Sequence, residues 1–402
     1  MTKKFFGLTR KGPPMRYSDE DLRDMADDLP DIVGVDGDAR SRLFCVMEIL
    51  NTYTDEKRGL TAKEIAQILM NRSDSGNLPS EPTVLADIHA IARNKPNGME
   101  ISIPEQGKSD GFKCTGRLVS SDQARLLISI VNACKFISQK QCSELVKALN
   151  RLVSFNQQDQ IAEGVYIDKA EREDNDNVFE AISVVSECMR EKKNIAFRYS
   201  YRGFDGRRRF LSNDEGGELF DETPIELVYS FGYYYLGTLR SSHEEGVVMM
   251  RRLDRMHDVR KAGPSSIDSK KVAGLKREIE GCVKHQFDMM GDGITRTVFL
   301  KVKKGPAVQI VYNRFGKACK FNQVSSDGEE AYVRLKAQLS PTFYRWIFGM
   351  GDMVEIVKPK SFLWATSGTW GKDSPSEEEL MEDYKAARNG FVEMLDKVRA
   401  AY

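Results

Sequence analysis

Apolar residues recur every three or four positions through much of the first 153 residues, which is typical of amphipathic helices. The helices predicted from this spacing cover residues 39–53, 61–69, 81–93, 120–136 and 138–153. Residues 99–114 instead alternate with a period of two, which predicts a β-hairpin. The chain therefore begins with helices and one hairpin.

Two of these helices carry start signals. Thr61 followed by Glu64 is a capping box, and Ser80 precedes a helix with Pro82 in its first turn. Three helices and a hairpin at this spacing predict a winged helix-turn-helix over residues 38–117.

The third helix of such a domain should offer DNA contacts from its N-terminal half. That half contains no basic residue, and positive charge comes from the far end, the preceding loop and the hairpin. The candidate duplex contacts are Arg72, Thr83, Arg93, Lys108 and Lys113. The scarcity of positive charge leaves a second interpretation open, in which the domain is a protein-docking or dimer module.

Two segments flank this domain. Residues 1–37 are basic and then acidic, which predicts a flexible charged arm. The acidic residues 18–31 are expected to form a short solvated helix after it, or the arm touches DNA phosphates. Residues 118–177 are predicted to hold two helices and, from Asn156, a polar linker. Apolar side chains such as Leu126 and Ile130 form either domain core or a homodimer interface, since helix-turn-helix regulators are commonly symmetric dimers.

From residue 194 onward, β-branched and aromatic residues replace the helical pattern. Residues 194–201 and 207–209 flank an Asp-Gly turn, which predicts a hairpin. After a polar insertion at 212–222, the stretches 224–237 and 247–256 predict further strands of a β-meander.

Tyrosine and arginine meet on these strands. The residues concerned are Tyr233, Tyr234, Tyr235, Arg251, Arg252 and Arg255. Phenol rings beside guanidinium groups can bind anions and stack on flat rings. Arginine clusters also occur as solvated faces with ion pairs, so both interpretations stay open.

This stretch resembles the WYL domain of bacterial transcriptional regulators. Residues 234–236 stand at the naming tripeptide, with tyrosine in place of tryptophan, and residues 252–256 stand at the later Leu-Asp-Arg motif, with Pro224 upstream. The resemblance implies an Sm-like or SH3-like β-barrel over residues 178–265 that binds an anionic effector, either a nucleotide or single-stranded nucleic acid.

Strand alternation places Tyr235 and Tyr234 on opposite faces, so Tyr235 is expected in the effector pocket and Tyr234 in packing. The candidate effector contacts are Tyr235, Arg252, Arg255, Arg209 and Tyr234.

Residues 294–360 read as strand, helix, strand, strand, helix and strand, between helices predicted at 268–290 and 375–399. This α+β pattern resembles the C-terminal extension that follows WYL domains, for which effector sensing or dimer contacts are implied. The expected fold class is α+β and multidomain. The expected divisions are 1–37, 38–117, 118–177, 178–265 and 266–402.

Composition indicates how charge is distributed and in which compartment the protein is expected. The 402 residues include 60 Lys plus Arg and 60 Asp plus Glu, so any positive field must be local. Seven cysteines without a CxxC motif indicate reduced thiols. No apolar run approaches the ~20 residues that span a bilayer, and the start lacks a signal-peptide core. A cytoplasmic protein without membrane contact is expected.

Chemical motifs are missing from the sequence. The histidines do not pair with another His or Cys at metal-ligand spacing, and GxSxG, Walker A and HExxH are absent. We therefore expect no metal, no cofactor and no enzymatic activity.

These patterns predict a ligand-responsive transcriptional regulator that binds double-stranded DNA as a homodimer. The alternative is a protein-interaction accessory of a nucleic-acid-processing system, without operator binding of its own. Duplex affinity that falls steeply with salt would distinguish the first from the second.

Overall fold

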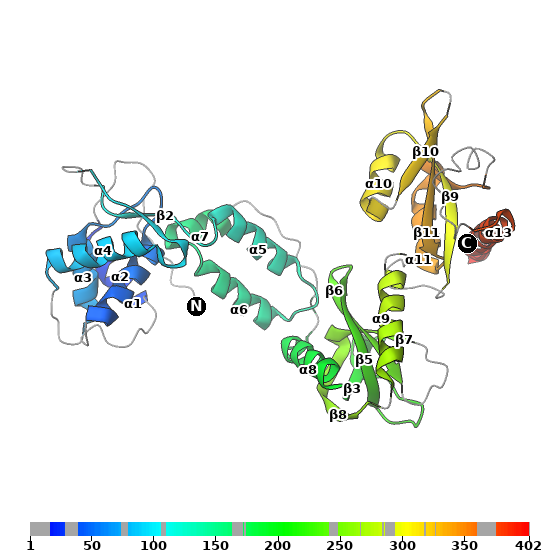
Figure 1. The fold of residues 1–402 in the computed structure, drawn as a ribbon, viewed down its shortest axis with the longest axis horizontal. Helices are drawn as coiled ribbons and strands as arrows, with labels where there is room; N and C mark the ends of the chain where they lie inside the picture. The colour runs from blue at the N-terminus through cyan, green and yellow to red at the C-terminus, as the bar shows by residue number, and fades with distance from the viewer. Residues whose placement is uncertain are drawn as a thin grey trace. The chain divides into compact units, whose positions relative to one another are not determined.

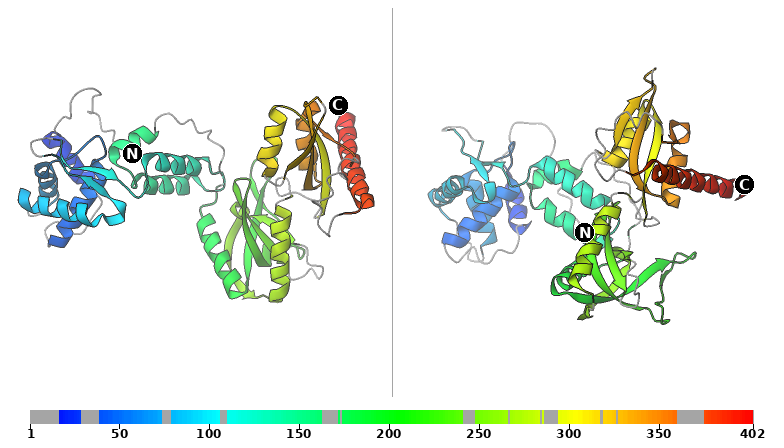
Figure 2. Two further views of the ribbon diagram at one scale, coloured as in Figure 1. Left: turned by 45° about the horizontal axis from the view of Figure 1, so that its top comes forward. Right: turned by 45° about the vertical axis from the view of Figure 1, so that its right-hand side comes forward.

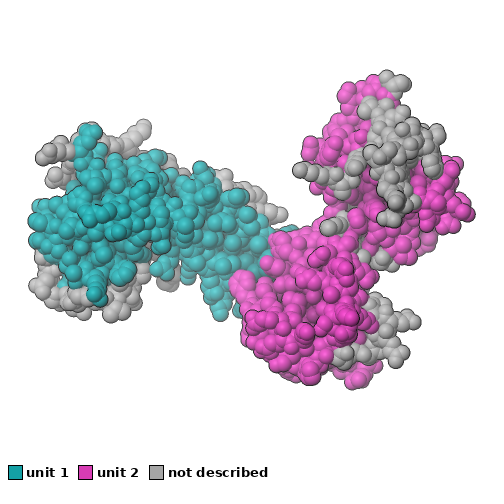
Figure 3. Space-filling view, viewed as in Figure 1, with its two compact units in different colours: residues 1–176 teal, residues 177–402 magenta. Residues whose placement is uncertain are grey.

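The computed structural model of the chain divides into two compact units, residues 1–176 and 177–402 (Figure 3). The structure describes residues 17–28, 39–73, 79–105, 110–162, 172, 174–240, 248–265, 267–283, 285, 294–316, 319–325, 327–359 and 375–401. Residues 1–16 of the predicted arm, the candidate Lys108 and most of the predicted linker after residue 162 lie outside these ranges.

The first unit begins with a helical core followed by a hairpin (Figure 1). Its elements are α1 (Asp19–Asp28), α2 (Ala39–Tyr53), α3 (Ala62–Arg72), α4 (Glu81–Asn94), η1 (Pro96–Gly98), β1 (Glu100–Ser102) and β2 (Lys113–Gly116). The Thr61 capping box and the Ser80 cap form as predicted. Strands β1 and β2 pair antiparallel, and an isolated bridge between Leu60 and Phe112 joins the segment before α3 to the hairpin.

Helix α1 forms where a short helix was expected, but it is not solvated on all sides. Leu22, Met25 and Ala26 are buried in the core shared with the next three helices. Tyr53 Oη donates to the carbonyl of Met25 at 2.8 Å. The acidic residues masked an apolar spacing of three and four, which places one face of α1 in the core.

Three further helices complete the first unit: α5 (Ser121–Ala133), α6 (Gln139–Asn150) and α7 (Phe155–Ala162). Helix α7 lies where a polar linker was predicted. Ser154 caps it, since Gln157 N–H donates to Ser154 Oγ at 3.2 Å and Ser154 N–H donates back to the Gln157 side chain at 3.1 Å. Ile161 packs with Ala124 and Val153, so burial of apolar surface stabilises this helix.

The second unit opens with a sheet flanked by α8 (Val178–Glu191) and α9 (Ser269–Val283) (Figure 2). Its strands are β3 (Lys193–Arg202), β4 (Arg208–Phe210), β5 (Leu219–Ser230), β6 (Tyr233–Arg240), β7 (Val248–Arg252) and β8 (Met256–Pro264). The order is β4-β3-β5-β6-β7, with β8 also paired to β3. Strand β5 starts five residues before Pro224, so 219–222 belong to the sheet and not to an insertion.

The expected closed barrel is not found among the described strands. Strands β7 and β8 are joined by the short helix η2 (Leu253–Arg255), but no pairing between them is described. Helix η2 carries the chain from β7, which pairs with β6, to β8, which pairs with β3. The described sheet therefore curls, but its ladder of hydrogen bonds does not close.

The remaining elements form a second α+β layer. They are β9 (Thr295–Lys303), α10 (Pro306–Phe315), β10 (Lys320–Val324), β11 (Glu330–Gln338), α11 (Pro341–Gly349), η4 (Gly351–Met353), β12 (Val354–Ile356) and α13 (Glu377–Ala401). The predicted strand-helix alternation is confirmed. The sheet is antiparallel with order β10-β11-β9-β12, the split βαβ topology of ferredoxin-like folds. Helices α10 and α13 lie on opposite sides of it (Figures 1 and 2).

Candidate functional site

Strands β6 and β7 bring tyrosine and arginine together by their register. Tyr235 stands opposite Arg252, and Leu236 stands opposite Arg251. Because neighbouring residues of a strand point to opposite faces, the two arginines lie in different environments. One arginine belongs to the core and the other to a second, partly buried cluster.

Arg252, whose side chain is 19% exposed, is the centre of this second cluster, in which Asp254 is buried. The carbon atom at the centre of its guanidinium lies 3.7 Å from the ring centroid of Tyr233. Its Nε and Nη2 donate to the two carboxylate oxygens of Asp254 at 3.1 and 2.5 Å. A guanidinium held by a carboxylate against an aromatic face is fixed in orientation.

Charge and burial modify this cluster. Burial lowers the pKa of the Arg252 guanidinium, but Asp254, Tyr233 and Tyr235 together raise it above its ordinary value. Tyr199 Oη accepts the backbone N–H of Arg252 at 3.0 Å. Burial raises the pKa of Tyr199, against the opposing effect of that hydrogen bond and of Arg255 and Arg251. Both shifts favour the protonated forms, the cationic guanidinium of Arg252 and the neutral phenol of Tyr199.

Arg251 is buried and serves the interior of the sheet. Its Nη2 donates to Glu222 at 2.6 Å, and its guanidinium carbon lies 4.9 Å from the Phe220 ring and 5.2 Å from the Tyr199 ring. A buried charge is tolerated when it is paired and hydrogen-bonded. Aromatic rings therefore surround the cation as well as its paired carboxylate.

Glu222 compensates for more than one cation. Besides Arg251, it accepts from Arg240 Nε at 3.1 Å and from Thr238 Oγ1 at 2.5 Å. Arg240 also donates to Asp214 at 2.9 Å. Glu222 was not predicted as a site residue because residues 212–222 read as a polar insertion. The burial of Phe220 and Glu222 on alternate positions of β5 is seen only in the structure.

The five predicted effector residues separate into two groups. Arg252 and Tyr235 lie together, although Tyr235 is only 9% exposed, and Arg255 is close enough to influence the pKa of Tyr199. Tyr234 instead packs on the ring of Tyr229 at 5.0 Å between centroids. Arg209 lies in the β3–β4 hairpin, where it donates to Asp205 at 3.3 Å. Tyr233 and Asp254 are the functional side chains that were not assigned from sequence.

The described DNA-contact candidates are mostly engaged within the fold. Arg72 donates to the carbonyl of Ala26 at 2.9 Å, which ties α3 to α1. Thr83 Oγ1 lies 2.7 Å from Ser80 Oγ in the cap of α4, and Lys113 pairs with Asp110 at 3.8 Å. Arg93 is exposed in the last turn of α4.

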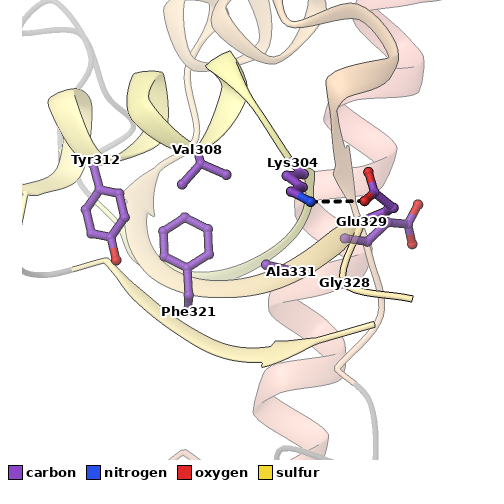
Figure 4. Close-up of a pocket in the computed structure, with 8 residues that line it drawn as sticks. Lys304, Val308, Tyr312, Phe321, Gly328, Glu329 and Ala331 are labelled. Carbon is purple, nitrogen blue, oxygen red and sulfur yellow. Dashed lines mark hydrogen bonds and ion pairs between the residues drawn. The ribbon is translucent and has the colours of Figure 1, made fainter. Parts of the chain in front are cut away.

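A hollow of about 250 Å³ lies between α10 and the β10–β11 hairpin (Figure 4). Val308, Tyr312 and Phe321 line one side, and the two rings are 4.9 Å apart. At the opposite side Lys304 pairs with Glu329 at 3.1 Å. The paired lysine brings no net positive charge, so this hollow suits a small apolar group and not a phosphate.

Metal ligands and membrane spans are not found in the described residues. They contain no group of three His, Cys, Asp or Glu side chains placed to hold a metal ion. Within the part of the chain that the structure describes, no helix has both the length and the apolar character needed to cross a membrane.

The fold and the site define a multidomain α+β protein with a guanidinium–tyrosine cluster on a curled sheet. No known family model and no curated protein matches the chain. It is similar to proteasome accessory factor B/C (PafBC) of Arthrobacter aurescens, with 15% identity and a TM-score of 0.23, over 80% of this chain and 44% of that one. It is also similar to a CRISPR Cas-related protein, with 11% identity and a TM-score of 0.30, over 97% and 89%.

The chain thus spans less than half the length of PafBC. Because both TM-scores are below 0.5, the function of this protein is inferred from its own residues.

Proposed function

We propose that the protein is a ligand-responsive transcriptional regulator, not an enzyme, and that its WYL-like sheet binds an anionic effector at Arg252. The observation that carries this proposal is the guanidinium of Arg252 lying 3.7 Å from the Tyr233 ring, held by Asp254. An oriented cation on an aromatic face suits a ligand with a phosphate and a flat base. Tyr235 is buried opposite Arg252 in the strand register, and Tyr233 offers the more exposed ring.

Duplex DNA binding is assigned to the first unit. Helices α2 to α4 followed by β1 and β2 support a winged helix, with α4 as the helix that reads the groove. The effector would change DNA affinity only if it binds two arrangements of the protein unequally.

A homodimer is part of the proposal. Leu126, Leu127 and Ile130 of α5 are 60%, 40% and 51% exposed, and they lie within one turn of each other. A second copy of α5 would cover them by two-fold symmetry, as regulators of palindromic operators require.

The alternative function is a protein-docking accessory. It is favoured by α4, whose N-terminal turn carries Glu81 and no cation, and by the internal contacts of Arg72 and Lys113. In that case the first unit would bind a protein partner, and duplex affinity would be negligible even at low salt.

The test is a binding assay at low salt with the full chain. The probes are a labelled duplex from the gene's own upstream region, a labelled single strand and a mononucleotide. Arg252→Lys keeps a cation beside Asp254 but removes the planar fork, so effector affinity should fall at least about tenfold. Arg260→Lys, an exposed site on β8, is the matched control and should bind like wild type.

The outcomes separate the two functions. Duplex binding that responds to the single strand or the mononucleotide, and loses that response in Arg252→Lys, supports the regulator. Duplex binding with an unchanged response in Arg252→Lys removes the effector site from this cluster. Absence of duplex binding supports the docking accessory.

A further inference from the structure

The hairpin between β3 and β4 carries a concentration of charge that the Arg252 cluster does not explain. Residues 198–211 contain five arginines and one acidic residue, Asp205. Asp205 is occupied within the hairpin, since it accepts the backbone N–H of Arg207 at 3.1 Å and pairs with Arg209 at 3.3 Å. Arg198 is neutralised outside the hairpin, since it pairs with Asp258 at 2.5 Å. The hairpin is still net positive in a chain of zero net charge, because four arginines (Arg202, Arg207, Arg208 and Arg209) face the single carboxylate of Asp205.

The register of this hairpin places like charges opposite each other. Arg202 pairs with Arg208 across the strands, and Tyr201 pairs with Arg209. Like charges directly opposite in an antiparallel pair destabilise a sheet. A local conflict of this kind is expected where the residues serve a ligand instead of stability. Two guanidinium groups projecting from one face suit successive phosphates of a polyanion.

Phe204 stands at the tip with a relative exposure of 115%. A single exposed apolar side chain is common on proteins and needs no explanation alone. Here two backbone hydrogen bonds fix the turn: Gly203 N–H donates to the Arg207 carbonyl at 3.0 Å, and Gly206 N–H donates to the Gly203 carbonyl at 2.9 Å. Gly206 adopts a φ of 74°, which glycine accommodates readily. A presented ring on a fixed turn loses little entropy when it stacks.

We propose that the β3–β4 hairpin binds single-stranded nucleic acid, in which Phe204 stacks on a base and Arg202, Arg207 and Arg208 hold the adjacent phosphates. Aromatic rings interleaved with cations bind single strands, because unpaired bases expose their faces. A duplex would have to be kinked to admit the ring. The inference rests on the proposed function in one respect, because that function assigns an anionic ligand to this sheet. It narrows the ligand to single-stranded nucleic acid and adds the β3–β4 hairpin as a place where it binds.

The experiment measures the anisotropy of fluorescein-labelled oligothymidine with the full chain at low salt. Phe204→Ala should weaken binding by about five-fold to a hundred-fold. Phe348→Ala is the matched control, because Phe348 is also an exposed phenylalanine, 54% exposed on α11, and should have no effect. Joint replacement of Arg202 and Arg208 by Gln should also make binding less sensitive to salt, with a logarithmic slope shallower by roughly 0.7 for each phosphate that the variant no longer neutralises.

A variant that keeps an aromatic ring at the tip distinguishes loss of stacking from misfolding. Phe204→Trp should retain affinity, and its emission should be quenched by oligothymidine but not by an abasic oligomer of the same length. Equal affinity of Phe204→Ala and wild type, or equal quenching by the abasic oligomer, would overturn the stacking role. Absence of single-strand binding by the wild type would overturn the whole proposal.

The two proposals fail in different ways. If Arg252→Lys loses its response to a mononucleotide while Phe204→Ala binds oligothymidine normally, the hairpin proposal is wrong and the effector site stands. If Phe204→Ala no longer binds oligothymidine while Arg252→Lys keeps both ligands, the effector site at Arg252 is wrong and the hairpin proposal stands.

Discussion

Arg251 and Glu222 form an ion pair inside the sheet of strands β3 to β8, with an N–O distance of 2.6 Å and side-chain exposures of 6% and 1%. Neither group could be left alone in this position, because an unpaired charge in a low-dielectric interior costs several kcal/mol. The pair therefore links β5 to β7 across the intervening β6.

The first prediction follows from that pair. Glu222→Gln leaves the buried Arg251 guanidinium without its carboxylate, whereas Arg240 keeps Asp214. It should lower the free energy of unfolding by roughly 3–5 kcal/mol, measured by urea denaturation. Glu329→Gln, which breaks the exposed pair with Lys304 at 3.1 Å, is the control and should cost less than about 1 kcal/mol. Similar losses in both variants would contradict a special role for burial.

The second prediction concerns the two neighbouring tyrosines. Tyr233→Ala removes the ring that contacts Arg252 and should weaken effector binding by about five-fold to tenfold. Tyr234→Ala removes a ring that packs on Tyr229, so it should weaken effector binding less. Titration of both variants with the mononucleotide checks this. A larger loss of affinity in Tyr234→Ala would place the ligand on the other face of the strand.

The third prediction uses glycines inside helices. A Cβ on Gly390 would overlap the phenol ring of Tyr344, so Gly390→Ala should destabilise the packing of α13 on α11 despite the better helix propensity of alanine. At Gly274 in α9 a Cβ meets open space, and Gly274→Ala should stabilise the protein by roughly 0.5–1 kcal/mol. Thermal unfolding that moves both variants in the same direction would disprove the packing argument.

The fourth prediction is a pH dependence. Burial raises the pKa of the Cys319 thiol to about 11 from an ordinary value of 9.0. Between these values the unfolded chain releases this proton and the folded chain keeps it, so stability should fall as pH rises from about 9 to about 11. Cys319→Ala should show a shallower fall of the urea midpoint over that range. An unchanged slope would show that Cys319 does not contribute.

Sequence patterns predicted the order of elements better than the roles of individual residues. The strand-helix alternation after residue 294 and the capping box at Thr61 are read from local chemistry, and both form as expected. A short helix was expected near α1, but its burial was not, because charge dominates its composition although Leu22 and Met25 keep helical spacing.

The carboxylates of the site were harder to predict. Glu222 and Arg251 are 29 residues apart and meet only after β5, β6 and β7 pair, so nothing local announces their interaction. Asp254 stood inside the recognised motif, but whether its carboxylate turns toward Arg252 depends on the three-residue helix η2.

Asp254 also sets the selectivity of the proposed effector site. An incoming anion meets a guanidinium that already holds a carboxylate at 2.5 Å. A ligand with one negative charge and no other interaction would only exchange one anion for another, with little net gain in free energy. A useful ligand must bring a second charge or a stacking ring, so the protein's own carboxylate acts as a threshold that excludes abundant simple anions.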